Sequence, residues 1–159
     1  MIDLQVEALA QALLAKGWRA VTAESCTGGG VAHQLTTLAG SSGWLEGGFV
    51  TYSNAMKQRL LGVPEAVFIG PGAVSQECVE AMAEGALQHS DAQLSVAISG
   101  IAGPGGGTPD KPVGTVWFAW ASTEGDLKSL CHCFNGDRQT VRDQAVVAAI
   151  SGMLRMAQN

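Results

Sequence analysis

Residues 22–29, Thr-Ala-Glu-Ser-Cys-Thr-Gly-Gly, place a candidate nucleophile, Ser25, shortly before a pair of glycines. The segment falls where a short β-rich stretch gives way to a helical pattern. Backbone N–H groups at a helix start lack intrahelical acceptors and lie at the positive end of the helix dipole, so they can bind an oxyanion or a phosphate. Ser25 could therefore attack a carbonyl beside N–H donors of Thr27, Gly28 and Gly29. A simpler interpretation stays open, in which Ser25 or Thr27 only caps the helix.

A second strand-to-helix junction occurs at residues 51–57, Thr-Tyr-Ser-Asn-Ala-Met-Lys. Ser53 or Asn54 can cap the following helix, which puts Lys57 about one turn inside it. A lysine at such a position is usually exposed and charged. If Lys57 is instead partly buried, desolvation lowers its pKa, and the neutral amine can act as a base for a neighbouring hydroxyl.

The third segment is a glycine-rich loop at residues 99–109, Ser-Gly-Ile-Ala-Gly-Pro-Gly-Gly-Gly-Thr-Pro. Its spacing is G-x2-G-x-G, not the G-x-G-x2-G of dinucleotide-binding folds, and no helical pattern follows it. Glycines let backbone N–H groups approach an anionic ligand closely, so the loop is typical of an anion site. A flexible surface turn is the alternative interpretation.

Other familiar catalytic and metal-binding patterns are missing from the sequence. It contains no G-x-S-x-G elbow, no S-x-x-K pair and no G-x4-G-K-[ST] phosphate loop. His33, His89 and His132 fall in predicted helices or a strand, and no spacing favours a Ser-His-Asp triad, although such triads are defined in space. Cys131 and Cys133 alternate along a predicted strand and lack zinc-site spacing. We therefore expect two small side chains facing the core and no metal site.

The elements that must position these segments follow from periodicity and capping residues. Apolar spacing and caps predict helices at residues 3–15, 28–38, 54–60 and 75–89 and a last helix after Asp137, and β-rich stretches predict strands at residues 18–24, 44–52, 94–99, 113–121 and 127–134. The short connection at residues 123–126 indicates an antiparallel hairpin. This order predicts an α/β fold, a layered sandwich with helices on both faces of a mixed β-sheet.

Composition restricts the class of protein. A length of 159 residues fits a single domain, residues 1–159, and an apolar fraction of 47% can fill its core. A net charge of −5 with scattered Lys and Arg argues against a nucleic-acid partner, and no apolar run is long enough for a membrane span.

The first residues lack a signal-peptide pattern, so we expect a cytoplasmic protein. A charged fraction of only 14% favours a homo-oligomer, in which another copy covers part of the surface.

Together, the three segments resemble the CinA C-terminal domain family. The resemblance continues through residues 72–75, 111–116 and 136–142, so it covers nearly the whole chain in the family's order. Stand-alone members of this family are nicotinamide-nucleotide amidohydrolases. The resemblance therefore implies a small-molecule substrate, nicotinamide mononucleotide, whose carboxamide is hydrolysed to nicotinic acid mononucleotide and ammonia. It implies no metal and no redox cofactor.

The resemblance also implies roles for individual residues. Ser25 matches the family's nucleophile and Lys57 its general base, while Tyr52 matches a tyrosine near the base that relays a proton or contacts the ring. Ser99 stands where many members have threonine, and it keeps the hydroxyl. Arg142 is a candidate charge partner for the substrate. The residues expected to bind the phosphate or ribose through the glycine loop are Ser99, Gly100, Gly103, Gly105 and Gly106.

Two other functions remain open at this point. A nucleotide-binding or regulatory module could keep the pocket without catalysis, and a related amidase could act on another small amide. Binding of the mononucleotide without ammonia release would favour the first, and competition among pyridine nucleotides would identify the second.

Overall fold

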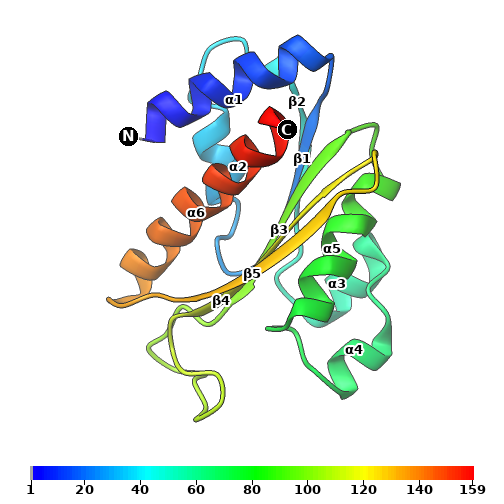
Figure 1. The fold of residues 1–159 in the computed structure, drawn as a ribbon. Coiled ribbons are helices and arrows are strands. Elements are labelled where there is room, and N and C mark those ends of the chain that lie inside the picture. Colours follow the sequence, from blue (N-terminus) through cyan, green and yellow to red (C-terminus); the bar gives the residue numbers. More distant parts are fainter. Residues whose placement is uncertain (1) are drawn as a thin grey trace.

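The computed structural model describes residues 2–159 and contains a five-stranded sheet with helices on both faces (Figure 1). The strands are β1 (Ala20–Glu24), β2 (Leu45–Val50), β3 (Leu94–Gly100), β4 (Thr115–Ser122) and β5 (Leu127–Cys133). The helices are α1 (Ile2–Lys16), α2 (Gly30–Leu35), α3 (Asn54–Leu61), α4 (Glu65–Ile69), α5 (Gln76–Gln88) and α6 (Arg138–Gln158), with a short 3-10 helix at Ser41–Gly43. This architecture confirms the predicted α/β fold with a mixed sheet.

The sheet has the strand order β2-β1-β3-β4-β5 and combines a parallel half with an antiparallel half. β1 pairs in parallel with β2 and β3, whereas β4 runs antiparallel to β3 and to β5. Because β1, β2 and β3 are parallel, their carboxyl ends lie at the same edge. Ser25 follows β1, Thr51 follows β2, and Ser99 lies at the end of β3. The topology therefore gathers the three segments at one edge, where ligands commonly bind in such sheets.

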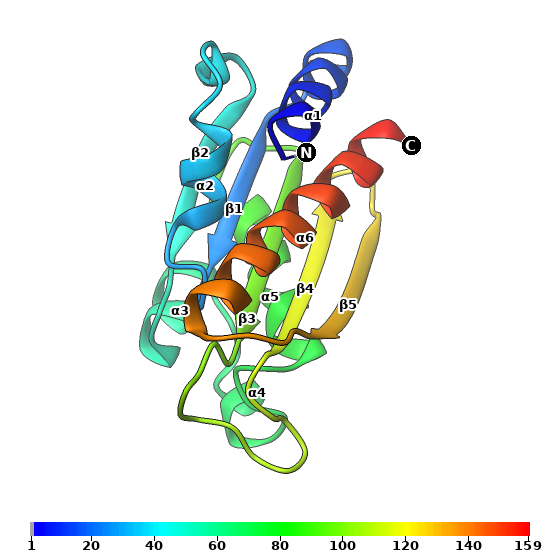
Figure 2. The same cartoon turned by 90° about the vertical axis from the view of Figure 1, so that its left-hand side faces the viewer.

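Helices α1, α2 and α6 cover one face of the sheet (Figure 2). Their apolar side chains pack against alternate residues of the strands. Gly152 of α6 lies so close to the Trp120 indole that a Cβ there would overlap the ring, and the indole N–H donates to the Ala149 carbonyl at 2.9 Å. These contacts hold α6, which carries Arg138 and Arg142, firmly against the sheet.

Helices α3, α4 and α5 cover the opposite face (Figure 1). The Ser75 hydroxyl accepts the Cys78 N–H at 3.1 Å, so α5 begins after the predicted cap. Gly85 of α5 packs on the backbone of Leu61 in α3, where a side chain would overlap the carbonyl. This contact sets the spacing of the two helices and therefore the position of Lys57, one turn earlier in α3.

The structure differs from the sequence-based prediction at α4 and β5, and α2 ends at Leu35, before the predicted end at residue 38. No helix is predicted for Glu65–Ile69, where α4 forms, because five residues make little more than one turn and show no recurring apolar spacing. The expectation that Cys131 and Cys133 face the core is wrong. Both are exposed, because β5 is an edge strand that the helices leave largely uncovered.

None of the helices in the described part of the chain has the length and apolar character of a membrane span.

Candidate active site

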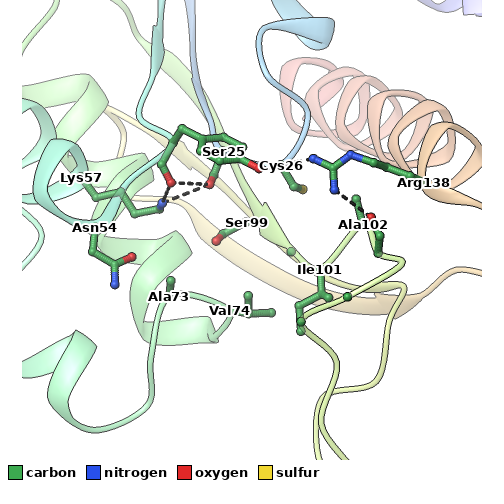
Figure 3. Close-up of a pocket in the computed structure, with 15 residues that line it drawn as sticks. Ser25, Cys26, Asn54, Lys57, Ala73, Val74, Ser99, Ile101, Ala102 and Arg138 are labelled. Carbon is green, nitrogen blue, oxygen red and sulfur yellow. Dashed lines mark hydrogen bonds between the residues drawn. The ribbon is translucent and has the colours of Figure 1, made fainter.

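Ser25 stands directly after β1, in the turn that leads to α2. Its N–H donates to the Ile98 carbonyl at 3.0 Å, which extends the pairing of β1 with β3 by one residue. The Gly28 N–H closes the turn by donating to the Ser25 carbonyl at 3.0 Å. These bonds fix the backbone of Ser25 and leave its hydroxyl directed at Lys57 (Figure 3).

A buried carboxylate, not a hydroxyl, caps α2. Glu24 accepts the N–H groups of Val31 and Ala32 at 2.9 and 3.0 Å. It also accepts the Thr27 hydroxyl at 2.6 Å, and it is fully shielded from solvent. The N-cap residue of α2 contributes no side-chain hydrogen bond. The interpretation of Ser25 or Thr27 as the helix cap is therefore wrong, and the Ser25 hydroxyl is not engaged by the helix.

Lys57 is buried in the first turn of α3, although a lysine at such a position is usually exposed. Ser53 caps the helix by accepting the Met56 N–H at 3.1 Å. Lys57 is only 1% exposed. Its Nζ donates to the Tyr52 carbonyl at 2.9 Å and lies 3.0 Å from the Ser25 Oγ (Figure 3). Within residues 2–159, no carboxylate forms an ion pair with this amine.

Burial lowers the pKa of Lys57 below its ordinary value of 10.5, against smaller opposing effects of the Cys78 and Cys26 thiols. An ammonium group taken out of water loses hydration free energy, and here no neighbouring carboxylate offsets that loss. At a given pH, a larger fraction of Lys57 is therefore in the neutral form than of an exposed lysine. A neutral amine in contact with a serine hydroxyl can accept its proton, which would make the hydroxyl oxygen a stronger nucleophile.

The two side chains face a pocket of about 290 Å³ at the carboxyl edge of the parallel strands. Ala73 and Val74, in the connection from α4 to α5, form one wall, and the glycine loop forms another (Figure 3). Ser99 is only 2% exposed and lines the pocket. The predicted site residues that line the pocket are Ser25, Tyr52, Lys57, Ser99, Gly100, Gly103, Gly105 and Gly106.

The remaining predicted site residues, Thr27, Gly28, Gly29 and Arg142, do not line this pocket. Arg142 reaches from α6 to the turn after β1, where its guanidinium donates to the carbonyls of Cys26 and Thr27 at 3.2 and 3.4 Å. The guanidinium therefore braces the turn that carries Ser25, and its geometry does not fit that of a charge partner inside the pocket.

The backbone N–H groups that could bind an oxyanion also differ from those expected, which were the N–H groups of Thr27, Gly28 and Gly29. The Gly28 N–H is already used by the Ser25 carbonyl. In contrast, the N–H of Cys26 contacts only its own thiol within residues 2–159, and Cys26 lines the pocket beside the hydroxyl. The Cys26 N–H is therefore better placed than Gly28 to donate to an oxyanion formed at Ser25. The Cys26 thiol has a pKa raised to about 11, mainly by burial, so it stays protonated near neutral pH.

Tyr52 contributes its backbone and its side chain to different parts of the site. Its carbonyl accepts the Lys57 amine, whereas its side chain is 63% exposed and its hydroxyl lies 3.3 Å from the Arg138 Nη2. Arg138 also donates to the Gly103 carbonyl at 2.8 Å. The Tyr52 hydroxyl is thus oriented towards the glycine loop and Arg138, and no hydrogen bond joins it to the Ser25–Lys57 pair in residues 2–159.

Arg138 is a pocket-lining residue that the sequence analysis missed. A signal was available, because Arg138 directly follows the Asp137 cap of α6, whose carboxylate accepts the Thr140 N–H at 2.9 Å. The positive end of a helix dipole disfavours a cation in the first turn, so an arginine there indicates a role other than helix stability. The sequence carries no comparable indication that Glu24 caps α2, because this role depends on the turn bringing the start of α2 back to the Glu24 carboxylate.

Comparisons with known proteins identify the family to which the chain belongs. The family model for the CinA C-terminal domain matches residues 3–157. A Pseudomonas putida protein named nicotinamide-nucleotide amidohydrolase PncC is 57% identical over 135 residues, which are 85% of this chain and 84% of that protein. The protein of the same name from Escherichia coli K12 is 53% identical over 91% of this chain and 87% of its own length.

Solved structures show the same fold. The crystal structure of a competence-damaged protein (CinA) superfamily member from Klebsiella pneumoniae superposes with a TM-score of 0.94, at 38% identity, over 99% of this chain and 98% of that one. A competence/damage inducible protein from Agrobacterium tumefaciens gives a TM-score of 0.89 at 39% identity, covering 98% of this chain and 96% of that one. The chain therefore belongs to the CinA C-terminal domain family.

Proposed function

We propose that this protein hydrolyses the carboxamide of nicotinamide mononucleotide, giving nicotinic acid mononucleotide and ammonia, with Ser25 as nucleophile and Lys57 as general base. The relatives named nicotinamide-nucleotide amidohydrolase support the substrate and the reaction. The observation that carries the mechanism is the 3.0 Å contact between the buried Lys57 amine and the Ser25 hydroxyl. Amide hydrolysis needs a nucleophile, a base and donors for an oxyanion, and all three types of group occur in the pocket.

In the proposed first step, Lys57 accepts the Ser25 proton while Oγ attacks the carboxamide carbon. The resulting oxyanion accepts a hydrogen bond from the Cys26 N–H, whose position beside the hydroxyl supports this role. Collapse of the intermediate breaks the C–N bond, and the protonated Lys57 gives its proton to the leaving nitrogen, which departs as ammonia. In the second step Lys57 takes a proton from water and the hydroxide attacks the ester carbon. The bond from this carbon to Oγ then breaks, Oγ takes back the proton from Lys57, and nicotinic acid mononucleotide is released.

The rest of the pocket supports binding of a phosphorylated, aromatic amide. Arg138 brings a cation to the pocket beside the Gly103 carbonyl, and backbone N–H groups of the glycine loop can bind a phosphate or ribose oxygen. The exposed ring of Tyr52 stands near Arg138, where it can contact the pyridine ring. The Ser99 hydroxyl is directed into the pocket and can hydrogen-bond the carboxamide (Figure 3). In this proposal Arg138 takes the charge-partner role first expected of Arg142.

We further infer that the enzyme works in the cytoplasm as a homo-oligomer. All four cysteines are free, which suits a reducing compartment. The sparse charge of the chain, together with exposed Leu127, Leu130 and Val147, supports a surface covered by another copy. Sedimentation of a monomer at micromolar concentration would refute the oligomer.

The test of the proposed function is ammonia release from nicotinamide mononucleotide by the purified protein. We expect turnover with the mononucleotide and slower turnover with nicotinamide riboside, which lacks the phosphate. Binding of the mononucleotide without ammonia would instead indicate a catalytically silent nucleotide-binding module. Preference for an unrelated small amide would indicate a different amidase.

A further inference from the structure

The glycine loop is anchored from two sides by cations that come from different parts of the chain. At its base, the Ile101 N–H donates to the Thr115 carbonyl at 2.9 Å. On the α6 side, Arg138 donates to the Gly103 carbonyl at 2.8 Å. On the other side, the half-buried Lys111 donates from its Nζ to the Pro71 carbonyl at 2.6 Å. The function described so far uses Arg138 and leaves Lys111 without a role.

The Lys111 contact joins the two facing walls of the pocket. Pro71 precedes the wall residues Ala73 and Val74 in the connection from α4 to α5. Lys111 lies two residues after the glycine loop, which forms the other wall. Loop and α4 lie at the same end of the molecule (Figures 1 and 2). Within residues 2–159, no other hydrogen bond links residues 64–75 to residues 100–114. The separation of the two walls therefore depends strongly on this one bond.

The loop needs such a tether because of its composition. Four of residues 103–107, Gly-Pro-Gly-Gly-Gly, are glycines without a side chain, and residues 104–110 are all exposed. Glycine loses more conformational freedom on ordering than any other residue, so an untethered loop would populate many open arrangements. When only a fraction of molecules holds the binding-competent arrangement, apparent affinity falls by that fraction, while turnover of the bound complex stays the same.

We propose that Lys111 is a positioning residue that holds the glycine loop against the substrate's phosphate end and so favours the nucleotide over its unphosphorylated analogue. The inference rests on the proposed function for the identity of the substrate. Lys111 does not line the pocket and touches neither Ser25 nor Lys57, so its effect is on binding. Its ammonium has no carboxylate partner within residues 2–159, and the neutral Pro71 carbonyl is its only recorded acceptor.

The test compares Lys111→Met with the wild-type protein and with Lys128→Met, which removes the same charge from the exposed strand β5. Ammonia release is measured with nicotinamide mononucleotide and with nicotinamide riboside. We expect Lys111→Met to raise KM for the mononucleotide about ten-fold, the scale of one hydrogen bond from a charged donor. We expect kcat for both substrates and KM for the riboside to stay near their wild-type values. Lys111→Arg can still donate to the Pro71 carbonyl and should restore most of the loss.

A fall in kcat, or an equal rise of KM for both substrates, would overturn the inference, because either result would mean a general structural role. Ammonia release by the wild-type protein is measured first, and this result tests the proposed function independently of the role of Lys111. If the wild type releases no ammonia, hydrogen exchange of the amides of Gly103 and residues 105–107 tests the tether. Faster exchange in Lys111→Met than in Lys128→Met supports the tether, and equal exchange refutes it.

Discussion

The Lys57 Nζ lies 3.0 Å from the Ser25 Oγ, although the two residues are 32 positions apart in the chain. They meet because β1 and β2 are parallel neighbours, so the turn after β1 and the helix after β2 begin at the same edge of the sheet. Neither histidine nor carboxylate touches the pair in residues 2–159. The geometry is that of an amine–hydroxyl pair in which the amine can serve as the base.

Replacing Lys57 with methionine removes the proposed base while keeping an unbranched side chain of similar length. We expect kcat for ammonia release to fall by about 10²–10⁴-fold, the usual contribution of a positioned general base. The fold should persist, because an apolar group then occupies a site that desolvates an amine. Thermal unfolding measured beside the assay checks this. Lys57→Arg should also be inactive, because a guanidinium does not lose its proton. A Lys57→Met variant with nearly full activity would rule out this base.

The lowered pKa of Lys57 predicts the direction of the pH dependence. The proposed base works only when neutral, so kcat/KM should rise with pH below the Lys57 pKa and level off above it. Since burial lowers that pKa, the plateau should begin below 10.5, the ordinary value of the amine. A rate profile measured from neutral to alkaline pH checks this. Activity that still increases through 10.5, or that declines as the amine loses its proton, would contradict the assignment.

Gly85 provides a test of how Lys57 is positioned from outside the pocket. A Cβ at residue 85 would overlap the Leu61 carbonyl and push α3 away from α5. We expect Gly85→Ala to cost about 1–3 kcal/mol of unfolding free energy, as overpacking does, and to lower kcat by displacing Lys57. Gly47→Ala is the matched control, because a Cβ there meets nothing within 4 Å. Equal stability and activity of the two variants would show that this contact does not position α3.

Much of the site could be predicted from local sequence because it sits at strand-to-helix junctions. Ser25 and Lys57 were found as polar residues at such junctions, and Ser75 and Asp137 as helix caps. These signals depend on residues within a few positions of each other. The pairing of β1 with both β2 and β3 is non-local, and the sequence pattern does not encode which strands become neighbours.

The features that the sequence did not predict all depend on tertiary packing. The carboxylate of Glu24 caps α2 only because the turn folds back on it. Arg142 reaches the backbone of the turn after β1 across 116 positions of sequence. Cys131 and Cys133 alternate like core residues, but an alternating pattern does not reveal that their strand lies at the edge. Burial of Lys57 likewise follows from the packing of α3 on α5 and not from its own neighbours in sequence.

The most direct test is ammonia release from nicotinamide mononucleotide by Ser25→Ala, measured beside wild type and Ser42→Ala. Ser42 is an exposed serine whose hydroxyl makes no recorded hydrogen bond in residues 2–159, so it controls for loss of a hydroxyl alone. With the proposed attacking oxygen removed and the fold intact, kcat should drop by roughly three orders of magnitude or more in Ser25→Ala and stay at the wild-type value in Ser42→Ala. A folded Ser25→Ala protein that releases ammonia at close to the wild-type rate would contradict the amine–hydroxyl mechanism.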